Sequence, residues 1–99
     1  MLECDIESAL VKRVKELNGL CEKFTSPGRR SVPDRIVTLP GNVVIFVELK
    51  APGKKPTKLQ LRDHARRKAL GCDVRVIDSL EQVTKFPGIF KTFDAADVE

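Results

Sequence analysis

The chain has 99 residues, of which 41% are hydrophobic and 32% are charged. This length is enough for one compact domain with a single core and too short for two. No apolar run approaches the roughly 20 residues that cross a membrane. The N-terminus is acidic, whereas a signal peptide is basic and then apolar. We therefore expect a cytosolic protein with no membrane contact.

The cysteines exclude two common kinds of site. There are three of them, far apart in the sequence, at Cys4, Cys21 and Cys72. An odd number at this spacing fits neither a disulfide framework nor the paired Cys-x-x-Cys ligands of a zinc site. We expect three reduced thiols.

Basic residues are concentrated in the middle of the chain. The net charge is +4, but the window 29–67 contains ten Lys and Arg against three acids, Asp34, Glu48 and Asp63. Such a basic zone favours a polyanionic partner, DNA or RNA, although a solvated basic surface without a partner has the same composition. The absence of Trp and Tyr argues against a single-strand platform of stacked aromatic rings.

The first third of the chain predicts a helix and then a strand. Apolar residues recur at helical spacing over 5–17, and Glu7 borders this stripe, which consists of Ile6, Leu10, Val14 and Leu17. Asn18 and Gly19 both tolerate the left-handed conformation that ends a helix. Residues 20–24 predict a short strand, and residues 25–31 have loop composition with two arginines at the tip.

A hairpin follows, and it places two carboxylates opposite each other. We expect strands over 35–39 and from Val43 onward, joined by a tight turn around Gly41. Asp34 and Glu48 each lie seven residues from Gly41, so they meet at the same end of the hairpin. Side chains alternate along a strand, so Lys50 shares the face of Glu48.

The rest of the chain completes a mixed α/β pattern. A basic loop over 51–56 leads to Thr57 and Gln60, the capping-box pattern of a helix that continues to about Leu70. A strand over 73–77 and a short helix that starts at Ser79 follow. The order α-β-β-β-α-β-α predicts a mixed sheet flanked by helices.

The acids and the lysine at the hairpin end suit a divalent cation. Mg²⁺ or Mn²⁺ prefers oxygen ligands and keeps several waters, and Asp34, Glu48 and the backbone carbonyl of Leu49 could supply the protein oxygens. Lys50 could orient a water or stabilise negative charge on a phosphate. The simpler alternative is an ion pair at the end of a strand.

Three segments resemble a known nuclease family. Val32-Pro33-Asp34, followed after 13 residues by Glu48-Leu49-Lys50, resembles the PD-(D/E)xK signature. The segments 26–35, 46–55 and 59–61 resemble the virus-type replication-repair nucleases (VRR-NUC) of that superfamily, in the type found in phages and bacteria. The resemblance extends from about residue 6 to residue 79 and implies a restriction-endonuclease-like core. It departs from the family at Ser31 and Asn18, where glycine is common.

The resemblance also implies roles for individual residues. Asp34 and Glu48 match the family's metal ligands, and Lys50 matches its catalytic lysine. Gln60 matches a glutamine close to the site. A glutamate of the first helix usually joins the site as a metal ligand, and we assign it to Glu7, with Glu3 as the weaker alternative.

The implied function is a Mg²⁺- or Mn²⁺-dependent endonuclease that acts on branched DNA, above all on four-way junctions. A homodimer is expected, because two symmetric cuts need two sites related by a twofold axis. The alternatives are a DNA-binding module without turnover and a nuclease of flap-cutting or restriction-like specificity. The expected phosphate contacts come from basic residues on both sides of the acids, Arg29, Arg30, Lys54, Lys55 and Lys58.

Three further expectations concern the domain bounds, the single histidine and the C-terminal phenylalanines. We expect a nuclease domain over 1–91 and a polar, acidic tail over 92–99. His64, one helical turn after Gln60, is expected to pack at a helix boundary, with contact to DNA or to the edge of the site as the alternative, and the metal site does not require it. Phenylalanines near the C-terminus are candidates either for a dimer contact or for the core, namely Phe86, Phe90 and Phe93.

Overall fold

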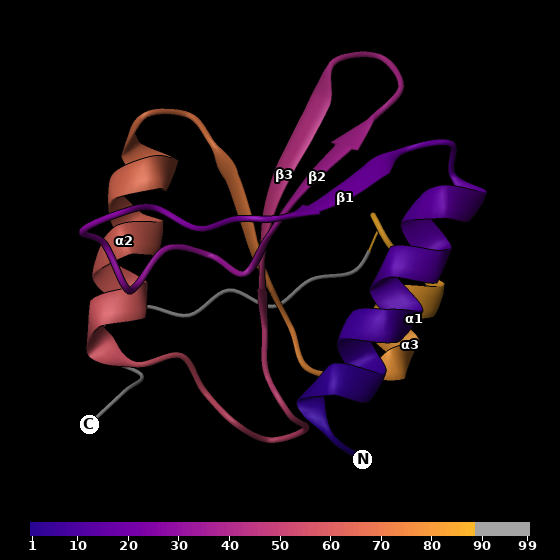
Figure 1. The fold of residues 1–99 in the computed structure, drawn as a ribbon, viewed down its shortest axis with the longest axis horizontal. Helices are drawn as coiled ribbons and strands as arrows, with labels where there is room; N and C mark the ends of the chain where they lie inside the picture. Colours follow the sequence, from indigo (N-terminus) through magenta and orange to yellow (C-terminus); the bar gives the residue numbers. More distant parts are fainter. Residues whose placement is uncertain (89–99) are drawn as a thin grey trace.

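The computed structural model describes residues 1–88, and its elements follow the predicted order (Figure 1). The helices are α1 (Glu3–Glu16), α2 (Lys58–Ala69) and α3 (Leu80–Thr84), and the strands are β1 (Leu20–Lys23), β2 (Arg35–Leu39), β3 (Val43–Leu49) and β4 (Asp73–Ile77). The prediction of a mixed α/β fold is confirmed. No helix among the described residues is both long and apolar enough to span a bilayer.

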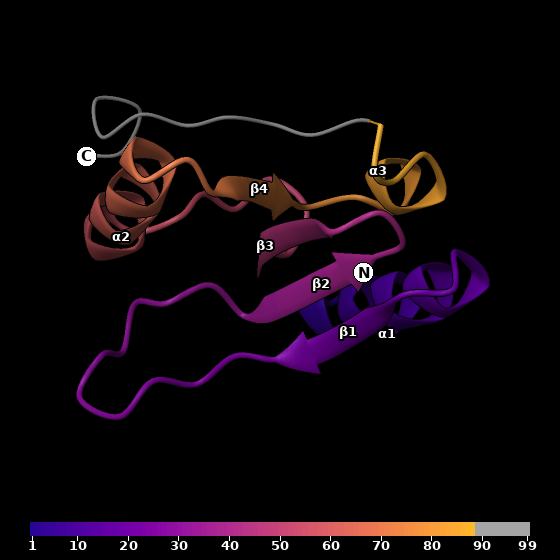
Figure 2. The ribbon, with the colours of Figure 1, turned by 90° about the horizontal axis from the view of Figure 1, so that it is seen from above.

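The four strands form one sheet in the order β1-β2-β3-β4 (Figure 2). β2 pairs with β1 and β3 in antiparallel fashion, and β4 joins β3 in parallel. In the hairpin, Arg35 pairs with Val47 and Leu39 with Val43, so the register is centred on Gly41 as predicted. Gly41 has a φ of 87°, a left-handed conformation that glycine adopts without strain.

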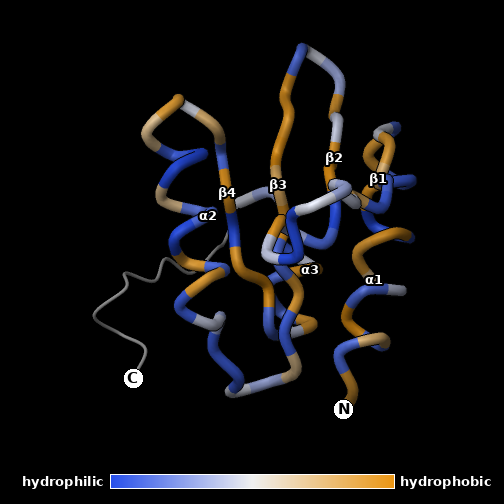
Figure 3. Tube along the Cα trace, turned by 60° about the vertical axis from the view of Figure 1, so that its left-hand side comes forward, coloured by the Kyte–Doolittle hydropathy of each residue, from blue (hydrophilic) through white to orange (hydrophobic). Residues whose placement is uncertain are grey.

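Helices cover both faces of the sheet. Helices α1 and α3 lie together on one face and α2 lies on the other (Figures 1 and 2). The strand β3, which is mostly hydrophobic, runs between them (Figure 3). The main core lies on the side of α1 and α3 and consists of Ile6, Leu10, Val14, Val37, Leu39, Ile45, Val47, Leu49, Ile77, Val83 and Phe86.

Local hydrogen bonds explain where α1 begins and ends. The helix starts two residues before the predicted boundary, because the Asp5 carboxylate accepts the Leu2 amide at 2.8 Å and so closes a first turn that includes Glu3. It ends as predicted, with Asn18 at a φ of 62°. The Gly19 amide then donates to the Val14 carbonyl at 2.9 Å.

The phenylalanine assignments divide between the core and the undescribed tail. Phe86 is fully buried in the main core, so the core interpretation holds for it and the dimer contact does not. Phe90, Phe93 and the acidic tail over 92–99 lie outside the described residues.

The junction between α1 and β1 provides a test of this packing. A β-carbon at Gly19 would lie 2.6 Å from the Thr38 carbonyl oxygen and 2.7 Å from a Leu39 methyl carbon. Because the first of these atoms is backbone, we expect Gly19→Ala to lower the free energy of unfolding by about 1–3 kcal/mol in urea titrations. The matched control is Asn18→Gly, which fits the left-handed backbone and should cost little. Equal stability of the two variants would contradict the packing described here.

Candidate active site

The hairpin brings Asp34 and Glu48 together at one end of the sheet. Asp34 directly precedes β2, and Glu48 lies at the penultimate position of β3. The backbone amide of Leu49 donates to Asp34 Oδ2 at 2.7 Å, which holds this carboxylate against the end of β3. The side chains of Asp34 and Glu48 are themselves hydrogen-bonded to each other. The predicted juxtaposition of the two acids is therefore present.

Glu48 is buried and makes contacts through both of its oxygens. Its exposed fraction is 1%. Gln60 Nε2 donates to Oε2 at 3.3 Å, and His64 Nε2 lies 3.2 Å from Oε1. Burial, the hydrogen bond with Asp34 and the charge of Asp34 raise the pKa of Glu48 to about 9, although the Lys50 ammonium acts in the opposite direction. Without a cation, Glu48 therefore holds a proton between itself and Asp34 at neutral pH.

The first turn of α2 fixes the orientation of Gln60. The predicted capping box is present, with the Thr57 hydroxyl accepting the Gln60 amide at 3.2 Å and Gln60 Oε1 accepting the Thr57 amide at 2.8 Å. Since Oε1 is engaged in the cap, the side-chain nitrogen of Gln60 remains available for Glu48. One residue thus starts the helix and links it to the acidic pair.

His64 lies beside the acids, at the edge of the predicted site, and is not merely packed at a helix boundary. It is 2% exposed and occupies the helical turn after Gln60, on the same face of α2. Burial, with Lys68 as the next cause, lowers the pKa of His64 to about 4. The ring is therefore neutral at pH 7, and its contact with Glu48 is a hydrogen bond and not an ion pair. The spacing of four residues from Gln60 is the sequence signal that indicated contact with the edge of the site as the alternative.

The two glutamates of α1 have different surroundings. Glu7 Oε2 accepts a hydrogen bond from Arg35 Nε at 3.0 Å in a partly buried ion pair. Burial and the charge of Asp34 raise the pKa of Glu3, and the Lys50 charge lowers it. Glu3 in turn contributes to the raised pKa of Glu48. The structure thus brings Glu3 within electrostatic range of the predicted site, whereas the carboxylate of Glu7 is engaged by Arg35.

At the end of β3, successive side chains lie on opposite faces of the sheet. Leu49 is 1% exposed and belongs to the main core. Glu48 points to the opposite face, toward α2, and Lys50 is half-buried beyond it. The Lys50 amide donates to the Ile77 carbonyl at 3.0 Å, so β4 holds this residue in place. The N-terminal turns of α1 and α2 lie at this same end of the sheet (Figure 1).

The donor set of this site fits a cation that prefers oxygen ligands. Among residues 1–88, no group of three or more His, Cys, Asp or Glu side chains is placed to hold a metal. The site instead offers two adjacent carboxyl groups, those of Asp34 and Glu48, as oxygen donors. Mg²⁺ is commonly bound by one or two carboxylates together with waters and substrate phosphates.

The basic side chains predicted to contact phosphate are exposed, and the structure shows what the Arg29 side chain contacts. Arg30, Lys54, Lys55 and Lys58 are exposed. The Arg29 guanidinium, by contrast, lies 3.6 Å from the buried Asp63 carboxylate of α2. This contact fastens the tip of the loop over 25–33 to α2.

A second contact holds the same loop at its base. Arg67 donates to Asp63 at 2.7 Å, and its guanidinium lies over the rings of Phe24 and Phe46, at 4.9 Å and 5.0 Å from their centroids. The Phe24 amide donates to the Asp34 carbonyl at 3.0 Å. The segment that carries Asp34 is therefore braced by α2 from both sides.

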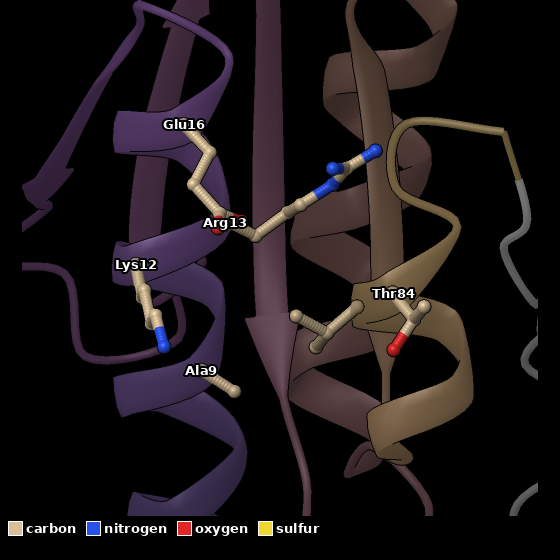
Figure 4. A pocket seen from close by; sticks show the side chains of 6 residues that line it. Ala9, Lys12, Arg13, Glu16 and Thr84 are labelled. Carbon is tan, nitrogen blue, oxygen red and sulfur yellow. The ribbon is translucent and has the colours of Figure 1, made fainter.

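A cavity of about 230 Å³ lies elsewhere, between α1 and α3 (Figure 4). Its lining comes from the C-terminal half of α1 and from α3, and includes Arg13, whose Nε donates to the Phe86 carbonyl at 3.2 Å. None of the predicted site residues lines it. The geometry of the carboxyl groups therefore locates the site, and this cavity does not.

The protonated state of Glu48 has a measurable effect on stability. Above pH 6.5, the ordinary pKa of histidine, His64 contributes little to the pH dependence. In this range folded Glu48 keeps its proton, whereas the unfolded residue, with a pKa near 4.5, has lost it. Folding then takes up a proton, so in metal-free buffer the free energy of unfolding should fall as the pH rises from 6.5 to about 9. Urea titrations across this range should give a flatter profile for Glu48→Gln. Parallel profiles would show that Glu48 does not titrate in this way.

Comparisons with known proteins agree with this geometry. No family model matches the chain. A relative described as "Putative nuclease p44", from Acyrthosiphon pisum secondary endosymbiont phage 1, is 53% identical over 87 residues, which cover 88% of this chain and 94% of the relative. A solved structure described as a VRR_NUC domain has 38% sequence identity and a TM-score of 0.79, over 84% of this chain and 90% of that one. The chain therefore belongs to the VRR-NUC family of nuclease domains.

Proposed function

We propose that this protein is a divalent-metal-dependent endonuclease that hydrolyses phosphodiester bonds in branched DNA, with four-way junctions as its main substrate. The observation that carries the proposal is the contact between Asp34 and Glu48, next to Lys50 and inside a basic surround. The name of the phage relative supports nuclease activity. Mg²⁺ or Mn²⁺ is the cofactor that fits the paired carboxyl groups.

Each polar group of the site has a defined task in this proposal. Asp34 and Glu48 hold the cation, with the backbone carbonyl of Leu49 as a further oxygen ligand. When bound, the cation lowers the pKa of a water and neutralises charge on the scissile phosphate. Lys50 orients the attacking water or stabilises the negative charge that develops on the phosphate. Gln60 keeps Glu48 in position through its hydrogen bond to Oε2.

A third carboxylate completes the site from α1, and we assign it to Glu3. The pKa of Glu3 responds to the charges of Asp34 and Lys50. Glu7, the residue favoured by the sequence pattern, is held by Arg35, so its role in this proposal is to position the start of β2. The electrostatic interaction of Glu3 with Asp34, and the engagement of Glu7 by Arg35, support Glu3.

The substrate and the assembly follow from the charge pattern and from symmetry. Arg29, Arg30, Lys54, Lys55 and Lys58 contact phosphates, which positions DNA without reading its sequence. Recognition is then of branched structure and not of base sequence. A single site can only nick, so paired cuts across a junction require a homodimer with twofold symmetry.

Cleavage assays on four labelled DNAs (a four-way junction, a fork, a flap and a linear duplex) test the proposal. We expect Mg²⁺- or Mn²⁺-dependent cleavage, fastest on the junction and absent in EDTA. Lys50→Ala should reduce the cleavage rate about 100- to 1,000-fold, because it removes a charge that acts on the reacting phosphate. The variant should still bind DNA.

Each other pattern of cleavage argues for a different protein. If the wild type and Lys50→Ala cleave none of the four DNAs, the protein is a DNA-binding module and not an enzyme. Preference for the flap or the linear duplex would replace junction specificity with a flap-cutting or restriction-like one. A molecular mass of one chain in solution, with and without DNA, would exclude the dimer.

The pair Glu3→Gln and Glu7→Gln separates the two helix glutamates. Both changes remove one negative charge from α1 without changing side-chain size. We expect Glu3→Gln to weaken Mn²⁺ binding at least about tenfold in calorimetric titrations, with a parallel loss of activity. Glu7→Gln should lower thermal stability through the lost Arg35 ion pair and leave Mn²⁺ affinity nearly unchanged. The reverse result would return the assignment to Glu7.

A further inference from the structure

Helix α2 has one face on the site and another that no part of the described chain covers. Leu61, Asp63 and His64 are buried on the inner face, and Gln60 reaches Glu48 from it. The outer face carries exposed residues at a spacing of four, namely Lys58, Arg62 and Arg66. Side chains four positions apart are neighbours on one side of a helix, so these three form a single row, which we call the α2 basic row.

Among residues 1–88, no acidic side chain forms an ion pair with the α2 basic row. Asp63 is the one acidic residue of α2, and its buried carboxylate is engaged by Arg67 and Arg29. Within residues 1–88, neither Arg62 nor Arg66 forms an ion pair. In the tube coloured by hydropathy, much of α2 is hydrophilic (Figure 3). An unpaired row of arginines and lysine favours an anionic partner.

The dimensions of the row match a nucleic-acid backbone. With a rise of 1.5 Å per residue, the row from Lys58 to Arg66 is about 12 Å long. One DNA strand carries a phosphate per 3.4 Å of duplex axis, so the row extends along about three phosphates. The exposed residues beside it, Ala65 and Ala69, are small, and a backbone can therefore approach the helix closely.

The row also begins at the site. Lys58 opens α2, two residues before Gln60 contacts Glu48. A duplex that reaches the acids with one phosphate would therefore extend along the outer face of α2. We infer that the α2 basic row, through Arg62 and Arg66, binds the phosphate backbone of the duplex DNA arm next to the cleavage point. This inference rests on the proposed function for the position of the DNA, but it assigns two residues that the catalytic proposal does not use.

Salt dependence of binding gives a direct test. In EDTA, where metal-dependent cleavage cannot occur, the affinity for a labelled duplex is measured over a range of salt concentrations. The slope of log K against log salt is negative, and each lost phosphate contact makes it shallower by about 0.9. Arg62→Gln with Arg66→Gln should therefore reduce its absolute value by about 1.8. Glutamine has a helix propensity close to that of arginine, and thermal melts verify that the variant folds.

The matched control removes the same charge from another surface. Lys12 and Lys15 are exposed on α1, and neither forms an ion pair within the described part of the chain. Lys12→Gln with Lys15→Gln should leave the slope nearly unchanged. An equal effect of the two double variants would overturn the inference in favour of a general effect of net charge. An unchanged slope in the α2 variant, or loss of binding to duplex RNA only, would also overturn it.

The binding result is independent of the catalytic proposal. If the protein cleaves none of the four DNAs, the slope measured in EDTA still tests the α2 basic row. If cleavage occurs, the loss in the α2 variant should appear in KM and not in kcat, because the row binds substrate and reacting phosphate equally. A fall in kcat at saturating DNA would instead assign these arginines to the chemical step and overturn the inference.

Discussion

Two carboxyl groups in contact inside a protein repel each other unless a proton or a cation lies between them. The hairpin imposes this contact. Its register pairs Arg35 with Val47, so Asp34 and Glu48 lie opposite each other at the same end of the sheet. Burial of Glu48 beside α2 increases the cost of its negative charge. The result is a buried acid whose pKa is raised to about 9 next to a second carboxyl group. The rest of the fold maintains this arrangement.

Helix α2 does most of that work from one surface. Its first turn orients Gln60, its second brings the neutral His64 to Glu48, and its third presents Arg67 to the two phenylalanine rings. These contacts fix the side chains on the inner face of α2, because each of them has a specific partner. The outer face has no such constraint within residues 1–88, so its charges remain available. A single helix thus holds the buried Glu48 with one face and presents basic side chains on the other.

Much of this could be predicted from the sequence, because it depended on local rules. The two-residue period of strands and the symmetry of the hairpin about Gly41 were sufficient to pair Asp34 with Glu48. The spacing of Thr57 and Gln60 was sufficient to start α2. Contacts between elements were harder to predict. The pairing of Glu7 with Arg35 depends on how α1 lies across the sheet, and periodicity fixes only which face of α1 is buried. His64 was undervalued for the same reason.

The choice between Glu3 and Glu7 shows where sequence reasoning ends. Both lie on α1, one helical turn apart, and a pattern of spacing cannot tell which of them reaches the acids. The difference arises from Arg35, which starts β2 directly after Asp34 and uses its guanidinium to hold both Glu7 and the Cys21 carbonyl. The Arg35 guanidinium engages the carboxylate of Glu7, whereas the charge of Glu3 acts on the pKa of Glu48. The arginine that anchors the hairpin to α1 therefore also gives the two glutamates different surroundings.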